Sequence, residues 1–144
     1  EVEALNWAPG IRSARYAPGT DSDRVSALLK AMEGKTDRVA RFTCAIAVAG
    51  LDIASARIIL EDADLEGTSY TWIDGCLVVM GWVNGQLTRR PRGANGFGYD
   101  PIFELAGGQT TAEISAEEKR RISHRGEASR QILPLLKTLF SLTN

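Results

Sequence analysis

Two glycines enclose an aromatic residue in the segment Gly96-Phe97-Gly98-Tyr99-Asp100-Pro101. Because glycine has no side chain, such a backbone can approach a flat ligand closely. The rings of Phe97 and Tyr99 could stack on a base, a contact worth about 1–3 kcal/mol, and the Asp100 carboxylate could accept a hydrogen bond from a ring N–H. Taken alone, however, the segment is more typical of a tight turn.

Cationic side chains gather a short distance further along the chain. Lys119 has a compact ammonium charge, and Arg125 has a planar guanidinium group. His124, the one histidine of the sequence, lies between Ser123 and Arg125. Such a set can hold phosphate, the more so at the N-terminus of a helix, which attracts anions. A lone histidine is more often structural than catalytic, so the cluster alone leaves both interpretations open.

Composition limits the class of partner. The formal net charge is -1, whereas proteins that bind long nucleic acids or anionic membranes need a sustained positive field. Local basic clusters, of which Arg89, Arg90 and Arg92 form another, suit a small polyanion better, although a solvated face is an equally good interpretation. No apolar stretch approaches the roughly 18 residues that span a bilayer.

The two cysteines indicate a reducing environment. Cys44 and Cys76 each lie in an apolar run and are expected to be small buried hydrophobes. One pair cannot make a disulfide scaffold, and no signal peptide is recognisable. We therefore expect a cytoplasmic protein.

The first ninety residues predict one helix and a set of strands. Asp21 or Ser22 can cap the helix and Gly34 ends it, with the apolar stripe Val25, Leu28, Leu29 and Met32. A strand with alternate buried residues covers 41–49. A meander then follows over 57–88, in which Asp74-Gly75 and Asn84-Gly85 are predicted hairpin turns between strands over Ser69–Ile73, Cys76–Val83 and Gln86–Thr88.

The rest of the chain predicts an irregular loop and two helices. Pro91–Pro101 holds three glycines and cannot be a regular element. Ser115 begins a short helix through a capping box with Glu118, and this helix carries Lys119. The last helix runs from about Arg125 to Leu142, where Pro134 should kink or restart it.

Taken together and in order, these motifs carry a resemblance. Gly93, Asn95 to Pro101 and Phe103 are followed by Thr111-Ala112-Glu113, Glu118-Lys119 and Ser123-His124-Arg125. This order resembles the C-terminal half of the inosine/xanthosine triphosphate pyrophosphatases, which hydrolyse non-standard purine nucleoside triphosphates. The stretch 8–17, with Glu1–Asn6 before it, matches a second signature of that family, so the resemblance covers most of the chain.

The resemblance implies a purine nucleoside triphosphate as substrate. In such enzymes Phe97 would stack on the base, Asp100 would read its 6-keto edge, and Mg²⁺ would activate the water that attacks the α–β phosphate link, releasing monophosphate and pyrophosphate. The residues implied in substrate binding are Ser13, Arg15, Phe97, Gly98, Tyr99, Asp100, Lys119, His124 and Arg125.

Three features depart from the family pattern. The family's N-terminal third, with a Gly-Asn-Lys phosphate loop, a Glu and an Asp-rich motif that would bind Mg²⁺, has no counterpart in the sequence. Ala27 stands where the family usually has Lys, and the segment 51–75 is longer than the family's connection. The remaining acids indicate a solvated face rather than metal ligands: Asp21, Asp23, Glu61, Asp62, Asp64 and Glu66.

Three functions follow as alternatives. The chain is part of an active pyrophosphatase, or an impaired or inactive relative that binds nucleotide or nothing, or an assembly module derived from that family. Carboxylates that converge near Lys119 and His124 would favour the first. Because no motif supplies them, we expect impaired or absent catalysis, with neither catalytic nor metal-binding residues retained.

The expected fold is α/β (α+β), a single domain over 1–144. A mixed twisted sheet flanked by helices would resemble the C-terminal two-thirds of the inosine triphosphate pyrophosphatase fold. Without the family's first strands one sheet edge would be bare, which favours association. We therefore expect a two-fold homodimer, through that edge or through the meander with Trp72 and Trp82 as anchors. The alternative is a monomer whose segment 51–75 caps the edge.

Overall fold

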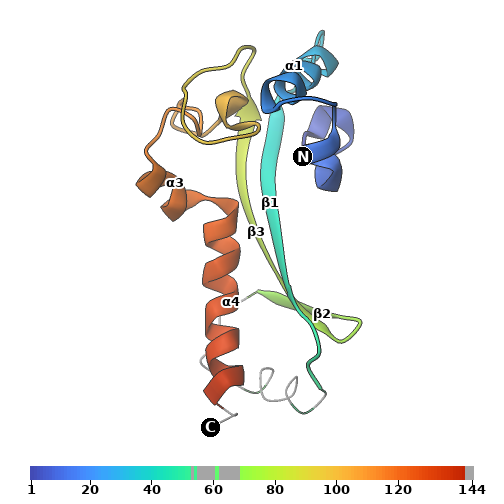
Figure 1. The fold of residues 1–144 in the computed structure, drawn as a ribbon, viewed down its shortest axis with the longest axis vertical. Helices are drawn as coiled ribbons and strands as arrows, with labels where there is room; N and C mark the ends of the chain where they lie inside the picture. The colour runs from blue at the N-terminus through green and yellow to red at the C-terminus, as the bar shows by residue number, and fades with distance from the viewer. Residues whose placement is uncertain (53, 55–60, 62–68, 142–144) are drawn as a thin grey trace. The chain divides into compact units, whose positions relative to one another are not determined.

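The structure, a computed structural model, describes residues 1–52, 54, 61 and 69–141 (Figure 1). The chain divides into two compact units, Glu1–Phe42 with Val83–Arg121, and Thr43–Trp82 with Ile122–Asn144. The predicted acids Asp62, Asp64 and Glu66, and the predicted helix end at Leu142, lie outside the described residues. The expectation of a single domain stays a prediction.

One sheet contains all the strands of the described residues. The strands β1 (Val39–Val48), β3 (Cys76–Leu87) and β2 (Tyr70–Ile73) lie in the order β1-β3-β2, and β4 (Phe103–Glu104) also pairs with β3 (Figure 1). Both β2 and β4 run antiparallel to β3. The predicted α/β fold, a sheet flanked by helices, is confirmed.

The first unit has a core between α1 (Asp21–Ala31) and the strand ends. Around it lie the 3-10 turns η1 (Glu3–Leu5), η2 (Gly10–Arg15) and η4 (Asp100–Ile102). Side chains of α1, η1, η4 and the strand ends pack in this core, and η2 contributes none of them. The buried members of the core are Val2, Val25, Leu28, Met32, Ala40, Leu87, Ile102 and Phe103.

The helix α1 begins at Asp21. This is one residue before the start that a cap at Asp21 predicts, and two residues before the start that a cap at Ser22 predicts. Thr20 is the N-cap, because its hydroxyl accepts from the Asp23 N–H at 3.3 Å and its own N–H donates to the Asp23 carboxylate at 2.7 Å. This reciprocal pair is a capping box, with Asp in the place of the more usual Glu. The helix ends at Ala31 rather than reaching Gly34, and the predicted apolar stripe is confirmed.

The two predicted hairpin turns have different outcomes. Asp74 and Gly75 have φ of 48° and 75° and join β2 to β3, so this turn is confirmed. The turn at Asn84-Gly85 is wrong, because β3 continues through it to Leu87. Two neighbours hold the strand straight: the Leu87 N–H donates to the Arg38 carbonyl at 2.8 Å, and Leu87 pairs with Phe103 of β4. Here the pairing partners override local turn propensity.

The second unit packs α4 (His124–Ser141) on β3. Leu77 and Val79 of the strand are buried with Ile132 and Leu135 of the helix, as the predicted apolar side of the helix requires. The helix continues through Pro134, so it does not restart there, and the alternative, a kink, stays a prediction. Burial of apolar residues on both sides of the proline stabilises the helix despite the lost backbone hydrogen bond.

The short helix α3 (Ala116–Ile122) precedes α4. Ser115 is its cap, as predicted, because the Ser115 hydroxyl accepts from the Glu118 N–H at 3.1 Å. Among the described residues no helix is long and apolar enough to cross a membrane.

Gly81 sets the approach of α4 to β3 in the second unit. A β-carbon at this buried position would lie 2.3 Å from both the Ala128 nitrogen and the His124 carbonyl oxygen. Both are backbone atoms, so neither can turn aside. We predict that Gly81→Ala lowers the free energy of unfolding by about 1–3 kcal/mol, the usual cost of overpacking.

Urea unfolding followed by circular dichroism measures this effect. Gly107→Ala is the matched control, because no atom lies within 4 Å of the β-carbon it would add. Equal midpoints for the two variants would contradict a backbone contact at Gly81.

Candidate functional site

The glycine-rich loop, Pro91–Pro101, is hydrogen-bonded to the segment that follows β4. The N–H groups of Ala94 and Asn95 both donate to the Ala112 carbonyl, at 3.2 and 3.0 Å, and the Asn95 side-chain amide donates to the Ile114 carbonyl at 3.1 Å. A β-carbon on Gly93 would lie 2.3 Å from the same Ala112 oxygen. The loop is therefore built on the backbone of residues 112–114.

Asp100 is the centre of this loop and only 3% exposed. One carboxylate oxygen, Oδ2, accepts from the Phe97 N–H at 2.8 Å and forms an ion pair with the Lys119 ammonium. The other, Oδ1, accepts from the Thr111 hydroxyl at 2.9 Å. These partners compensate the desolvation of a buried charge, and they join three segments that are separate in the sequence.

Of the two glycines beside Phe97, only Gly96 lacks room for a β-carbon. Gly96 has a φ of +80°, and a β-carbon there would lie 2.1 Å from Asp100 Oδ2 and 2.8 Å from Lys119 Nζ. Gly98 also has a positive φ, but its β-carbon would meet no atom within 4 Å. The close approach at Gly96 is thus to the ion pair, while the space that a β-carbon of Gly98 would occupy is open among the described residues.

Phe97 stands out from the loop, with 61% of its surface exposed. The Lys119 ammonium lies 4.9 Å from the centre of its ring, a cation–π contact. An exposed ring next to a fixed cation can stack on a planar ligand and hold an anionic or oxo group of that ligand at the same time.

Tyr99 has a structural contact in this arrangement. Its hydroxyl donates to the Ser13 carbonyl at 2.8 Å, and its ring packs on the core of the first unit. Burial raises the pKa of Tyr99 above its ordinary value. The structure therefore brings Ser13 to the loop through its backbone, whereas Arg15 is exposed on η2.

Asp21 makes a contact with the loop that the sequence did not predict. Its Oδ2 accepts from the Gly98 N–H at 2.6 Å while Oδ1 pairs with Arg24. The Arg24 guanidinium first, and then the Gly98 N–H, lower the pKa of Asp21. Asp21 is exposed, as a solvated face requires, and its carboxylate also contacts the loop. Because the two partners are 77 positions apart in the sequence, no local pattern could have revealed the contact.

His124 and Arg125 belong to the second unit, where they begin α4. His124 is partly buried and Arg125 is exposed. Phe97, Asp100 and Lys119 belong to the first unit and form one cluster there. The grouping of His124 and Arg125 with Lys119 stays a prediction.

The described residues do not form a group of ligands for Mg²⁺. No group of three His, Cys, Asp or Glu side chains converges among those residues. Asp100 is paired with Lys119, and Asp21 with Arg24. Because Mg²⁺ is held by carboxylate and other oxygen ligands, we derive no step through the metal from these residues.

The chain is similar to curated enzymes along nearly its whole length. It is 40% identical over 139 residues to a dITP/XTP pyrophosphatase of Prochlorococcus marinus and 41% identical over 140 residues to one of Symbiobacterium thermophilum. Each alignment covers 96% of this chain and 60% of the relative. The chain thus spans about three fifths of the length of these relatives.

Solved structures give the same result. The Staphylococcus aureus Ham1 protein superposes with a TM-score of 0.77 at 36% identity, over 95% of this chain and 62% of the other. A nucleoside-triphosphatase / dITP/XTP pyrophosphatase of Mycobacterium abscessus gives 0.67 at 36% identity, over 94% and 61%. The profile of the Ham1 family matches residues 1–135, and with these similarities it shows that the chain belongs to the Ham1 family.

Proposed function

We propose that this chain recognises the base of a non-standard purine nucleoside triphosphate, as part of a pyrophosphatase that converts inosine, xanthosine or deoxyinosine triphosphate to monophosphate and pyrophosphate. The observation that carries the proposal is the exposed Phe97 ring beside the Lys119 ammonium, both held by buried Asp100. Relatives that align with 96% of this chain at 40–41% identity are dITP/XTP pyrophosphatases, which supports the same substrate class.

Lys119 gives the site a means of choosing the base. Its ammonium has three donors and no acceptor, and one of them is directed to Asp100. The others can pair with an oxo group at position 6 of a purine or with a phosphate oxygen. They cannot pair with the amino group of adenine, so 6-oxo bases such as those of inosine and xanthosine are favoured over adenine.

Asp100 acts on the base indirectly in this proposal. Both of its oxygens already accept hydrogen bonds, from Phe97, Thr111 and Lys119. It therefore orients the stacking ring and the ammonium, and Gly98 leaves the backbone beside the ring open. Ser13, Arg15, His124 and Arg125 keep their proposed place near the substrate through the family resemblance.

Catalysis by these residues alone is proposed to be weak. Attack of water on the α–β link needs charge neutralisation and a positioned nucleophile, which Mg²⁺ supplies in phosphoryl transfer. The described residues offer no converging carboxylates for the metal. A non-catalytic nucleotide-binding or assembly role is the alternative that this observation favours.

We also propose a cytoplasmic location and a two-fold dimer. The thiols of Cys44 and Cys76 are free, as a reducing compartment would keep them. In the second unit, one side of β3 is buried under α4, and the other side exposes Met80 and Trp82. Exposed apolar residues in a row on one strand are typical of an interaction surface.

We predict that the 144-residue polypeptide hydrolyses inosine triphosphate far more slowly than a relative of full length. The metal contribution, worth several kcal/mol, would be missing. Pyrophosphate release should be assayed with inosine, xanthosine and adenosine triphosphates, beside the Symbiobacterium thermophilum enzyme as positive control. A turnover of about 1 per second, at the low end for enzymes, would contradict the prediction.

Phe97→Ala should weaken binding of inosine triphosphate by about 1–3 kcal/mol, the value of one base–aromatic stack. Calorimetry measures the change. Ile11→Ala is the control, because Ile11 is an exposed apolar residue of the same unit, 95% accessible, outside the cluster. If no purine triphosphate bound even at millimolar concentration, base recognition would be refuted and the assembly role favoured.

Light scattering after gel filtration should give the mass of a dimer at micromolar concentration. Trp82→Asp should shift the mass toward the monomer, because it places a charge on the exposed side of β3. Glu61→Ala, an exposed change outside β3, should leave the mass unaltered. A monomeric mass for the unmodified chain would rule out the dimer.

A further inference from the structure

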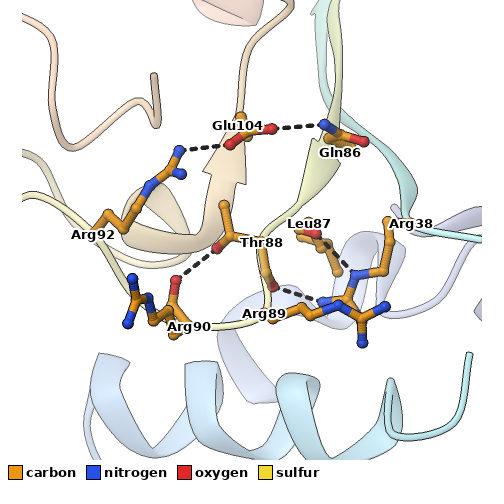
Figure 2. A pocket seen from close by; sticks show the side chains of 8 residues that line it. All are labelled: Arg38, Gln86, Leu87, Thr88, Arg89, Arg90, Arg92 and Glu104. Atoms are coloured by element: carbon orange, nitrogen blue, oxygen red, sulfur yellow. Dashed lines mark hydrogen bonds and ion pairs between the residues drawn. The ribbon is translucent and has the colours of Figure 1, made fainter. Parts of the chain in front are cut away.

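A hollow lies in the first unit, and its lining includes none of the residues Phe97, Asp100 and Lys119 that form the proposed base site. Its volume is about 460 Å³, within the range of about 300–1,000 Å³ that is usual for ligand pockets. We call it the arginine pocket (Figure 2); it is lined by Arg38, Gln86, Leu87, Thr88, Arg89, Arg90, Arg92 and Glu104.

The single carboxylate of this lining is already neutralised. Glu104 accepts from the Gln86 amide and from the Arg92 guanidinium, each at 2.6 Å, and these two bonds lower the pKa of Glu104. Arg92 also donates to the Gly108 carbonyl at 2.8 Å. The charges of Arg38, Arg89 and Arg90 remain without a carboxylate in the lining.

Arg38 is held rigidly, and its partners are neutral. Its Nε donates to the Leu87 carbonyl at 2.9 Å and its Nη2 to the Thr88 carbonyl at 2.6 Å (Figure 2). Carbonyl groups fix the guanidinium but leave its full charge. Burial, and then the charge of Arg89, lower the pKa of Arg38, so the two cations lie close enough to repel each other.

Arg89 extends its guanidinium beside that of Arg38, while Arg90 points to the other side (Figure 2). Both residues are exposed. Among the described residues, no hydrogen bond or ion pair engages the guanidinium group of either. A fixed cation beside an uncommitted one, in a concave site, focuses a positive field on the space between them.

We propose that the arginine pocket binds a phosphate anion between Arg38 and Arg89, with Arg90 adding to the field. Guanidinium forks match the oxygens of phosphate in paired hydrogen bonds, and an anion at this position removes the repulsion between the two cations. The pocket can hold a free phosphate anion, such as inorganic pyrophosphate, or the phosphate of a nucleotide. The proposal does not depend on the base site.

Titration of the chain with inorganic pyrophosphate at low ionic strength tests this site, by calorimetry and by NMR of the arginine side-chain N–H groups. We expect saturable binding, with shifts at Arg38 and Arg89. Arg89→Ala should weaken binding about tenfold or more, as loss of a charged hydrogen bond does. Arg89 makes no side-chain bond in the described structure, so this variant should keep the fold.

Arg12→Ala is the matched control, because Arg12 is an exposed arginine of the same unit and its loss changes the net charge equally. It should leave the affinity unchanged, and so should Phe97→Ala, which separates this site from base recognition. A parallel titration with inosine monophosphate in the Phe97→Ala background distinguishes a nucleotide phosphate from the free anion. Absence of pyrophosphate binding, or equal losses in Arg89→Ala and Arg12→Ala, would overturn the proposal.

Discussion

The candidate site depends on the compensation of one buried carboxylate. Asp100 is almost fully buried, and removing a partner from a buried ion pair costs about 3–5 kcal/mol. Lys119, the Phe97 N–H and the Thr111 hydroxyl together satisfy its two oxygens. The same bonds that stabilise the charge fix the backbone of the loop, and with it the direction of the exposed ring.

This requirement explains why separate motifs occur together in the sequence. The segment 110–114 holds the glycine-rich loop in place. Its Ala112 carbonyl accepts hydrogen bonds from two loop N–H groups, and the Thr111 hydroxyl donates to the buried carboxylate of Asp100. Helix α3 supplies Lys119 to the same carboxylate. A change in any of these segments would alter the others, so their order in the chain reflects one folded structure rather than several independent contacts with a ligand.

The elements that sequence could predict are those whose causes are local. Asp74-Gly75 forms its turn because both residues adopt the positive φ that a two-residue hairpin turn needs, and Ser115 caps α3 through a residue three positions away. Asn84-Gly85 carries the same turn signal, yet β4 and Arg38 hold that stretch extended. The Asp21–Gly98 contact is equally non-local. Propensity and capping do not encode which distant backbone lies alongside, so such contacts become visible only in the fold.

The cations of the first unit differ in how their charge is balanced, and this difference separates structural from binding roles. Lys119 is balanced by Asp100. The buried Nε of Arg92 makes no hydrogen bond, but it lies 3.5 Å from a Glu113 oxygen, so two carboxylates, Glu104 and Glu113, balance that guanidinium. Arg38 is held by carbonyl dipoles alone, which orient a cation without cancelling its charge. A cation fixed in this way attracts an anion from solution at little cost in side-chain entropy, since its conformational freedom is already lost on folding.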